Sequence, residues 1–183
     1  MASEGGKGSA VVDAVIDSLA FAKDGRYWSS RVDLADLPRL QDALARKSGF
    51  LDVALQGEYV AEQNGGDGQS SRSYLLLTVE GGLWLECQRC LEPVEVDIAI
   101  STRFLLVPSG QPWPDEELAD DGFDAIAADR QMALLPLIED ELLLSLPIAP
   151  RHVVCEAPHG QSEVVPDLSV VNPFAALAKL KKN

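Results

Sequence analysis

The strongest constraint on the fold of this chain is a strict alternation of apolar residues with polar or small ones between positions 94 and 101. Four β-branched residues occupy every second position: Val94, Val96, Ile98 and Ile100 alternate with Glu95, Asp97, Ala99 and Ser101. Successive side chains of a strand point to opposite faces, so this period of two buries one face and exposes the other. The pattern predicts a half-buried strand that continues toward Val107.

Neighbouring segments also predict strands. Apolar residues alternate with polar or small ones at 50–56, and further strands are predicted at 72–79 and 83–87. Residues 64–71, rich in Gly and Ser, predict a loop, and the glycine pair at 81–82 predicts a turn. Short turns between consecutive strands are typical of a meander. The predicted fold class is therefore α+β, with an antiparallel β-meander or partly open barrel flanked by a few short helices.

Three helices are predicted beside the strands. The first spans 36–47, where an aspartate caps the start, leucines recur at helical spacing and Gly49 ends the helix. A second, leucine-rich helix begins near Pro136 and ends at Pro147. The third spans 172–182, after an Asn-Pro start signal. These elements frame the domain organisation.

Residues 1–10, rich in glycine, are predicted to form a flexible tail, 11–155 a single α+β domain, and 156–183 a loop with the C-terminal helix. Within the domain, 108–129 is predicted to be an acidic loop, because prolines precede seven acidic residues without any basic one. Such a run is usually a solvated loop. The alternative is a surface that attracts a basic protein.

The net charge of −14 is unevenly distributed. Residues 1–60 carry 7 basic and 9 acidic residues, a net of −2, so residues 61–183 carry the remaining −12. A negative field repels a phosphate backbone and attracts basic proteins. The chain has no run of about 18 apolar residues that would cross a membrane, and its start lacks the features of a signal peptide. We therefore expect a cytoplasmic protein without membrane contact.

A pair of cysteines, Cys87 and Cys90, forms a C-x2-C motif between two predicted strands. A tight turn of this kind points both sulfurs at one ion and recurs in zinc sites. His152 and Cys155 would complete a Cys3His set of four ligands. Structural zinc is thus the cofactor that the sequence suggests, and metal-free thiols are the alternative. A redox role is disfavoured because a strand, and not a helix, follows the pair.

Six basic residues are candidate contacts to RNA or to a protein partner: Arg26, Arg31, Arg39, Arg46, Lys47 and Arg89. Arg39 and Arg46 are seven positions apart, which would place them on one face of the predicted helix. Cations of this kind bind the phosphates of an RNA loop. The alternative is an exposed helix face that keeps the protein soluble.

Catalysis has little support in the sequence. It contains no G-x-S-x-G elbow, no P-loop and no G-x-G-x-x-G motif. The three carboxylates at 139–141 are consecutive on a predicted helix, so nothing pairs them as an acid and a base. We interpret them as a solvated helix face and expect a protein that is not an enzyme.

Three stretches, taken in order, resemble the YceD family, the large-subunit ribosomal RNA accumulation proteins: LECQRCLEPV (85–94), IEDELLLSLPIAPRH (138–152) and NPFAALAKLKK (172–182). The resemblance implies a role in the accumulation or processing of the precursor of the large-subunit ribosomal RNA, and no known catalytic activity. The family motif marks these positions of the chain: Cys87, Arg89, Cys90, Pro93, Glu139, Asp140, Glu141, Pro147, His152, Cys155, Asn172, Pro173 and Phe174.

The leading hypothesis is therefore a non-enzymatic ribosome biogenesis factor that supports synthesis, processing or accumulation of 23S rRNA. Its expected partners are large-subunit precursor rRNA, a basic ribosomal protein, or both, and no small-molecule substrate is expected. One alternative is a zinc-dependent RNA-processing enzyme, which needs an open metal position and a general base. Another is a barrel whose strands at 50–107 enclose a small ligand.

Overall fold

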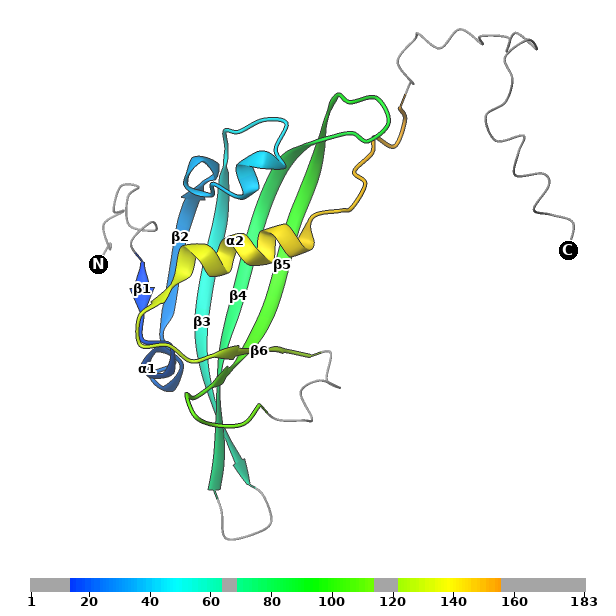
Figure 1. Ribbon diagram of the computed structural model, residues 1–183. Helices are drawn as coiled ribbons and strands as arrows, with labels where there is room; N and C mark the ends of the chain where they lie inside the picture. The colour runs from blue at the N-terminus through cyan, green and yellow to red at the C-terminus, as the bar shows by residue number, and fades with distance from the viewer. Residues whose placement is uncertain (1–13, 64–68, 114–121, 156–183) are drawn as a thin grey trace, which may run out of the picture.

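The main feature of the fold is a five-stranded sheet with the strand order β2-β3-β4-β5-β6. The computed structural model describes residues 14–63, 69–113 and 122–155. The strands are β2 (Tyr27–Asp33), β3 (Phe50–Gln63), β4 (Gln69–Glu86), β5 (Pro93–Val107) and β6 (Asp124–Ala127). The first four pair antiparallel and β6 pairs parallel to β5. The sheet is long, twisted and not closed (Figure 1). The predicted α+β class with a partly open sheet is confirmed.

Because the sheet does not close, the described strands form no barrel interior. The predicted barrel that encloses a small ligand is therefore wrong. Instead, apolar side chains of one sheet face pack against the helices and turns that cover it. Among the buried residues of this face are Leu51, Leu77, Ile98 and Phe104. The alternation of residues 94–101 is the pattern that such one-sided burial requires.

The predicted turn at 81–82 is wrong, because β4 runs without a break through both glycines. Gly81 pairs with Leu51 on one side and with Ile98 on the other. Its φ of +154° is open to glycine but rarely to other residues. A Cβ atom at this position would lie 2.6 Å from Cδ2 of Leu51. The glycine thus permits close approach of a neighbouring side chain within a strand and does not reverse the chain.

The predicted helix at 36–47 is also wrong, since this segment folds into two 3-10 turns, η1 (Leu34–Asp36) and η2 (Leu40–Asp42). Leu37 lies between them with φ −111° and ψ 80°, outside the helical region. The following Pro38 clashes with a helical conformation of the residue before it, which accounts for the break. The leucines of this segment are buried all the same, without a continuous helix.

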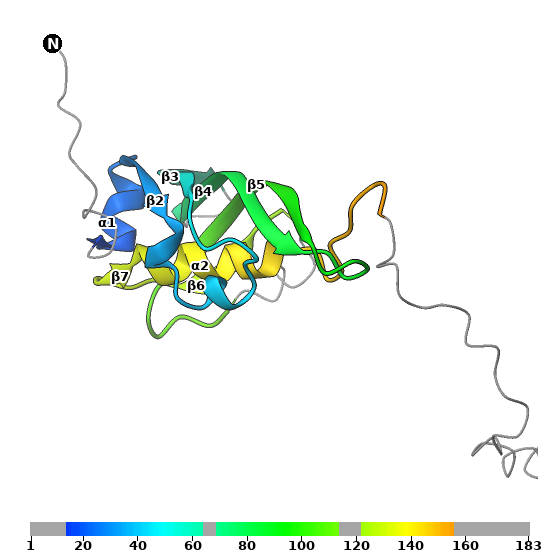
Figure 2. The same ribbon diagram turned by 90° about the horizontal axis from the view of Figure 1, so that it is seen from above.

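Two α-helices lie on the sheet. The predicted second helix is confirmed as α2 (Leu134–Ser145), which crosses the covered face of the sheet (Figures 1 and 2). The shorter α1 (Ser18–Lys23) begins with Asp17, whose carboxylate accepts the backbone N–H of Ala20. A small second sheet pairs β1 (Val15–Ile16) with β7 (Met132–Ala133) beside the main one. Neither described helix is both long and apolar enough to cross a membrane.

Part of the predicted acidic loop at 108–129 is ordered structure. Four of its residues form β6, in which Ile126 pairs with Leu106 of β5. Farther along, the hydroxyl of Ser18 and the backbone of Asp129 exchange hydrogen bonds of 3.0 Å, which fastens the segment to α1. The predicted tail at 1–10 and the predicted C-terminal helix at 172–182 lie outside the described residues.

Candidate metal centre

The C-x2-C motif forms a tight turn between β4 and β5. The backbone N–H of Leu91 donates to the carbonyl of Cys87 (2.9 Å), and the N–H of Cys87 donates to the carbonyl of Glu92 (3.0 Å). Leu91 has φ +64°, a left-handed conformation that is rare for residues with a Cβ atom. The turn therefore holds Cys87 and Cys90 on the same side of the chain, at the end of the sheet.

The segment that follows α2 brings two more ligand side chains to this turn. After Leu146 the chain leaves the helix at Pro147 and runs alongside the turn (Figure 1). The N–H of Gln88 donates to the carbonyl of Pro150 at 2.9 Å, which fixes the two segments to each other. His152 and Cys155 consequently meet the cysteine pair.

The four side chains converge closely enough to hold one metal ion. Their ligand atoms all lie within 4.8 Å of one another. The Sγ atoms of Cys87 and Cys155 are 3.8 Å apart, and Sγ of Cys90 is 3.4 Å from Nδ1 of His152. A tetrahedral zinc ion, with Zn–S bonds of about 2.3 Å and Zn–N bonds of about 2.0 Å, sets edges of about 3.8 Å and 3.5 Å. The Cys3His set therefore fits a metal ion in donor chemistry and in spacing.

The ring of His152 is oriented by a partner outside the cluster. Its Nε2 lies 3.1 Å from the carbonyl oxygen of Pro93. Because a carbonyl only accepts hydrogen bonds, Nε2 carries the proton and the lone pair of Nδ1 faces Cys90. Second partners of this kind fix the tautomer of metal-binding histidines. Pro93, the first residue of β5, thus prepares the imidazole for coordination.

The backbone around the turn stabilises one thiolate. The pKa of Cys87 falls from about 9 to about 5, mainly because the backbone N–H of Cys90 donates to its sulfur, with the N–H groups of Arg89 and His152 adding to the effect. The pKa of Cys155 rises to about 11, first because burial disfavours its charged form and then because of the neighbouring sulfurs. A bound cation would remove that penalty, because it favours the deprotonated form of its ligands.

A comparison with known proteins assigns the chain to a family. The model of the family described as large ribosomal RNA subunit accumulation protein YceD matches residues 75–181, more than half of the chain. The chain belongs to the YceD family. A protein of Haemophilus influenzae, named large ribosomal RNA subunit accumulation protein YceD, is 31% identical over 106 residues, which cover 54% of this chain and 59% of that relative. No solved structure matches the chain. The resemblance seen in the sequence is confirmed.

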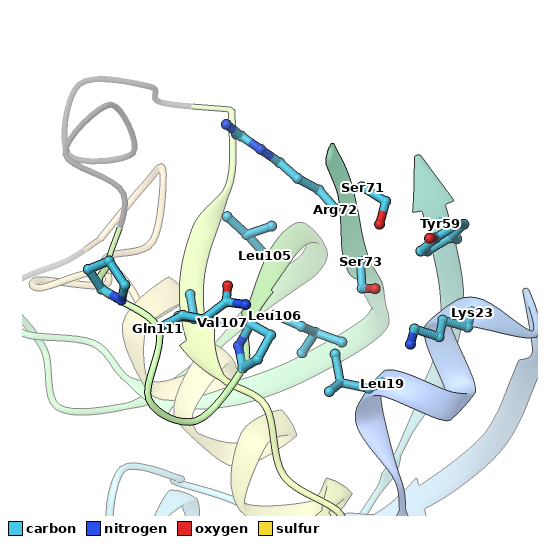
Figure 3. Close-up of a pocket in the computed structure, with 12 residues that line it drawn as sticks. Leu19, Lys23, Tyr59, Ser71, Arg72, Ser73, Leu105, Leu106, Val107 and Gln111 are labelled. Carbon is cyan, nitrogen blue, oxygen red and sulfur yellow. The ribbon is translucent and has the colours of Figure 1, made fainter. Parts of the chain in front are cut away.

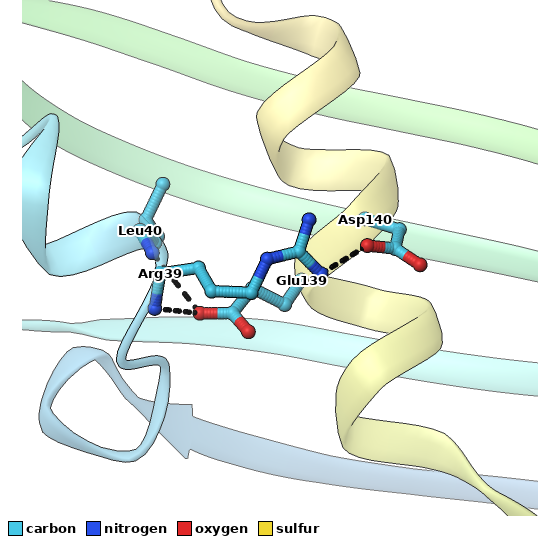
Figure 4. A network of polar contacts seen from close by, with 4 residues as sticks. All are labelled: Arg39, Leu40, Glu139 and Asp140. Atoms are coloured by element: carbon cyan, nitrogen blue, oxygen red, sulfur yellow. Dashed lines mark hydrogen bonds and ion pairs between the residues drawn. The ribbon is translucent and has the colours of Figure 1, made fainter.

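The region shared with the YceD family model includes all four residues of the cluster and a carboxylate that sequence analysis missed. Glu139, which we expected on a solvated face, is only 4% exposed. Its Oε1 accepts the backbone N–H groups of Arg39 (2.6 Å) and Leu40 (3.0 Å), as Figure 4 shows. The neighbouring Asp140 is exposed and pairs with the guanidinium of Arg39. Glu139 is therefore a structural residue that links α2 to the η turns.

In this YceD-family chain the predicted basic contact residues do not share one helix face. Arg31 pairs with Asp52 at 2.9 Å. Arg46 stacks on the ring of Trp84 at 3.8 Å. Arg39 pairs with Asp140. The other three members of the set are exposed and come from different segments: Arg26 precedes β2, Lys47 follows the η turns, and Arg89 lies in the cysteine turn. Because the helix expected to align Arg39 and Arg46 is absent, that alignment is wrong.

Proposed function

We propose that this chain is a non-enzymatic factor that supports the accumulation of 23S rRNA by binding the maturing large ribosomal subunit in the cytoplasm. The observation that carries the proposal is the family match over residues 75–181. The printed name of the Haemophilus influenzae relative refers to accumulation of large-subunit ribosomal RNA. The alignment covers 59% of that relative, and we propose that the role in its name extends to this chain.

We further propose that the Cys3His cluster holds structural zinc. Four protein ligands fill a tetrahedral site, whereas catalytic zinc keeps one position open for water or substrate. The set of Cys87, Cys90, His152 and Cys155 is of the closed kind. The zinc would fasten the cysteine turn to the segment after α2 and so stabilise a surface that can bind a partner. A closed site of this kind gives no support to the alternative of a zinc-dependent RNA-processing enzyme.

Charge supports a basic ribosomal protein as one partner. The chain carries 29 acidic and 15 basic residues, and a net charge of −12 out of −14 lies after residue 60. Ribosomal proteins are rich in positive charge, and complementary fields accelerate association. Precursor rRNA remains the second proposed partner, because exposed cations without a carboxylate partner occur in the described part of the chain: Arg26, Arg46, Lys47 and Arg89.

The test is crosslinking in cells, followed by purification of the tagged chain and identification of bound protein and RNA. We expect large-subunit proteins and precursor 23S rRNA, and we expect Cys90→Ser to reduce both while Gln88→Ser, in the same turn, leaves both unchanged. Recovery of neither kind of molecule would contradict the proposal. Turnover of an RNA substrate by the purified chain, abolished by a substitution that leaves it folded, would establish an enzyme instead.

A further inference from the structure

A pocket of about 370 Å³ lies at the end of the sheet opposite the metal centre. It is bounded by one side of α1, by the β3–β4 hairpin and by the chain that leaves β5. Its lining consists of Leu19, Lys23, Tyr59, Ser71, Arg72, Ser73, Leu105, Leu106, Val107, Pro108, Gln111 and Pro112 (Figure 3). Small-molecule sites have volumes of about 300–1,000 Å³. The pocket is therefore large enough for a small ligand or for one unit of a polymer.

The charge of the pocket is opposite to that of the chain. Among the described residues, its lining contains two cations and no acidic residue, although the whole chain has a net charge of −14. The ammonium of Lys23 points into the pocket (Figure 3) and has no ion pair within the described residues. The guanidinium of Arg72 extends away from Lys23, so Lys23 is the cation that faces the pocket. The arrangement favours an anion at Lys23.

The wall beside Lys23 offers an aromatic ring and hydroxyl groups. Tyr59 is 48% exposed, and it pairs across β3 and β4 with Ser73. Two positions away on β4, Ser71 presents its hydroxyl to the same side (Figure 3). Leu19 and Leu106 supply an apolar floor. A half-exposed ring beside hydroxyl groups and a cation can stack on a flat base while the cation binds a phosphate.

A close backbone contact positions Lys23. Gly57 of β3 lies directly under α1, where a Cβ atom would come within 2.3 Å of the carbonyl oxygen of Phe21. Phe21 and Ala22 are buried by this contact. Leu19 and Lys23, four residues apart, therefore share the side of α1 that faces the pocket.

We infer that this pocket binds a nucleoside phosphate, with the base stacked on Tyr59 and the phosphate held by Lys23. Ser71 and Ser73 would donate hydrogen bonds to the base or the sugar. The same chemistry is offered by a free nucleotide and by one nucleotide of single-stranded RNA. The inference rests on the proposed function only where it favours an RNA nucleotide over a free nucleotide. The preference for a nucleoside phosphate comes from the residues that line the pocket.

The test is titration of the purified full-length chain by calorimetry with four probes: adenosine monophosphate, adenosine, inorganic phosphate and a short single-stranded oligoadenylate. We expect the oligoadenylate and the monophosphate to bind, and adenosine and phosphate to bind at least about tenfold more weakly. The loss of one stacking or phosphate contact costs about this factor. Tighter binding of the oligoadenylate than of the monophosphate assigns the site to RNA, and equal binding assigns it to free nucleotides.

Paired variants at the same positions provide the controls. Tyr59→Leu and Lys23→Gln should each weaken binding about tenfold, whereas Tyr59→Phe and Lys23→Arg should retain it. Unchanged binding in Tyr59→Leu and Lys23→Gln, equal affinity for inorganic phosphate and the monophosphate, or no binding of either nucleotide probe would overturn the inference. Any of these results leaves the crosslinking test of the proposed function intact, because that test detects association at any surface.

Discussion

The carboxylate of Glu139 accepts a hydrogen bond from the backbone N–H of Leu40, which lies 99 positions earlier in the chain. The same oxygen accepts the N–H of Arg39. Together these bonds satisfy two donors at the start of the η2 turn, which has no side-chain cap of its own. A glutamate of α2 thus performs the capping that a local residue usually provides.

Replacing Glu139 by leucine should destabilise the fold by about 2–4 kcal/mol, because two backbone donors lose a charged acceptor and one of them is buried. Glu139→Gln retains an acceptor oxygen and should cost about 1 kcal/mol. Urea denaturation measures both free energies of unfolding. Asp140→Asn is the matched control: it removes the adjacent, exposed carboxylate, whose ion pair with Arg39 is screened by solvent and should change the stability little. Equal effects at both positions would contradict the capping role.

Metal analysis tests the candidate centre directly. We expect the purified chain to contain one zinc ion per molecule and Cys90→Ser to contain none, because a serine hydroxyl is a poor ligand for zinc. Treatment with a chelator should lower the melting temperature of the original chain and leave that of Cys90→Ser unchanged. Gln88→Ser, in the same turn, should keep the ion. If the purified chain contained no zinc and a chelator left its melting temperature unchanged, the three thiols and His152 would not form a metal site.

In the metal-free chain, the thiols of Cys87 and Cys155 should titrate separately. The pKa of Cys87, about 5, lies below its ordinary value of about 9, so its thiolate stabilises the fold fully above pH 9 and no longer does so below pH 5. The pKa of Cys155, about 11, is raised, so the stability from its protonated form is present below pH 9 and lost as the pH rises through 11. Ultraviolet absorbance of thiolates measures both steps. Cys87→Ser should remove the lower step and move the upper step to lower pH, because the Cys87 sulfur helps to raise the pKa of Cys155, and Cys155→Ser should remove the upper step.

Gly57→Ala should destabilise the fold by about 1–3 kcal/mol, because the added methyl group meets the backbone of α1 and forces the helix away from β3. Displacement of α1 moves Lys23, so the variant should also weaken binding of adenosine monophosphate. Gly82→Ala, where the nearest atom is 3.4 Å away, is the matched control and should change the stability by less than about 1 kcal/mol. Equal stability of the two variants would contradict the close packing at Gly57.

Local patterns predicted what depends on neighbours in sequence. The alternation at 94–101 identified β5. Because few residue types bind zinc, the three cysteines and His152 could be predicted from the sequence as one set of possible ligands. The glycine pair at 81–82 was misleading, since the need for glycine at Gly81 comes from Leu51 on the adjacent strand. Both a turn and a close contact between strands favour glycine, so the sequence alone does not show which of the two a glycine serves.

Glu139 illustrates the same limit within a helix. It stands between Ile138 and Asp140, and composition gives no reason to separate it from Asp140 or Glu141. One signal was present: Leu142, three positions later, lies on the same helix face and is buried. The partners of Glu139 are backbone groups of the η2 turn, which carry no signature in the sequence. Burial of this carboxylate therefore emerges only with the tertiary structure.

The unbroken course of β4 sets a fixed span between the two candidate binding regions. Ser73 borders the nucleoside phosphate pocket, and Cys87 follows the other end of the strand. At about 3.3 Å per residue, the intervening chain separates them by roughly 45 Å. Because the two regions lie at opposite ends of one strand, a small ligand in the pocket would not contact a metal ion held by the cysteine turn.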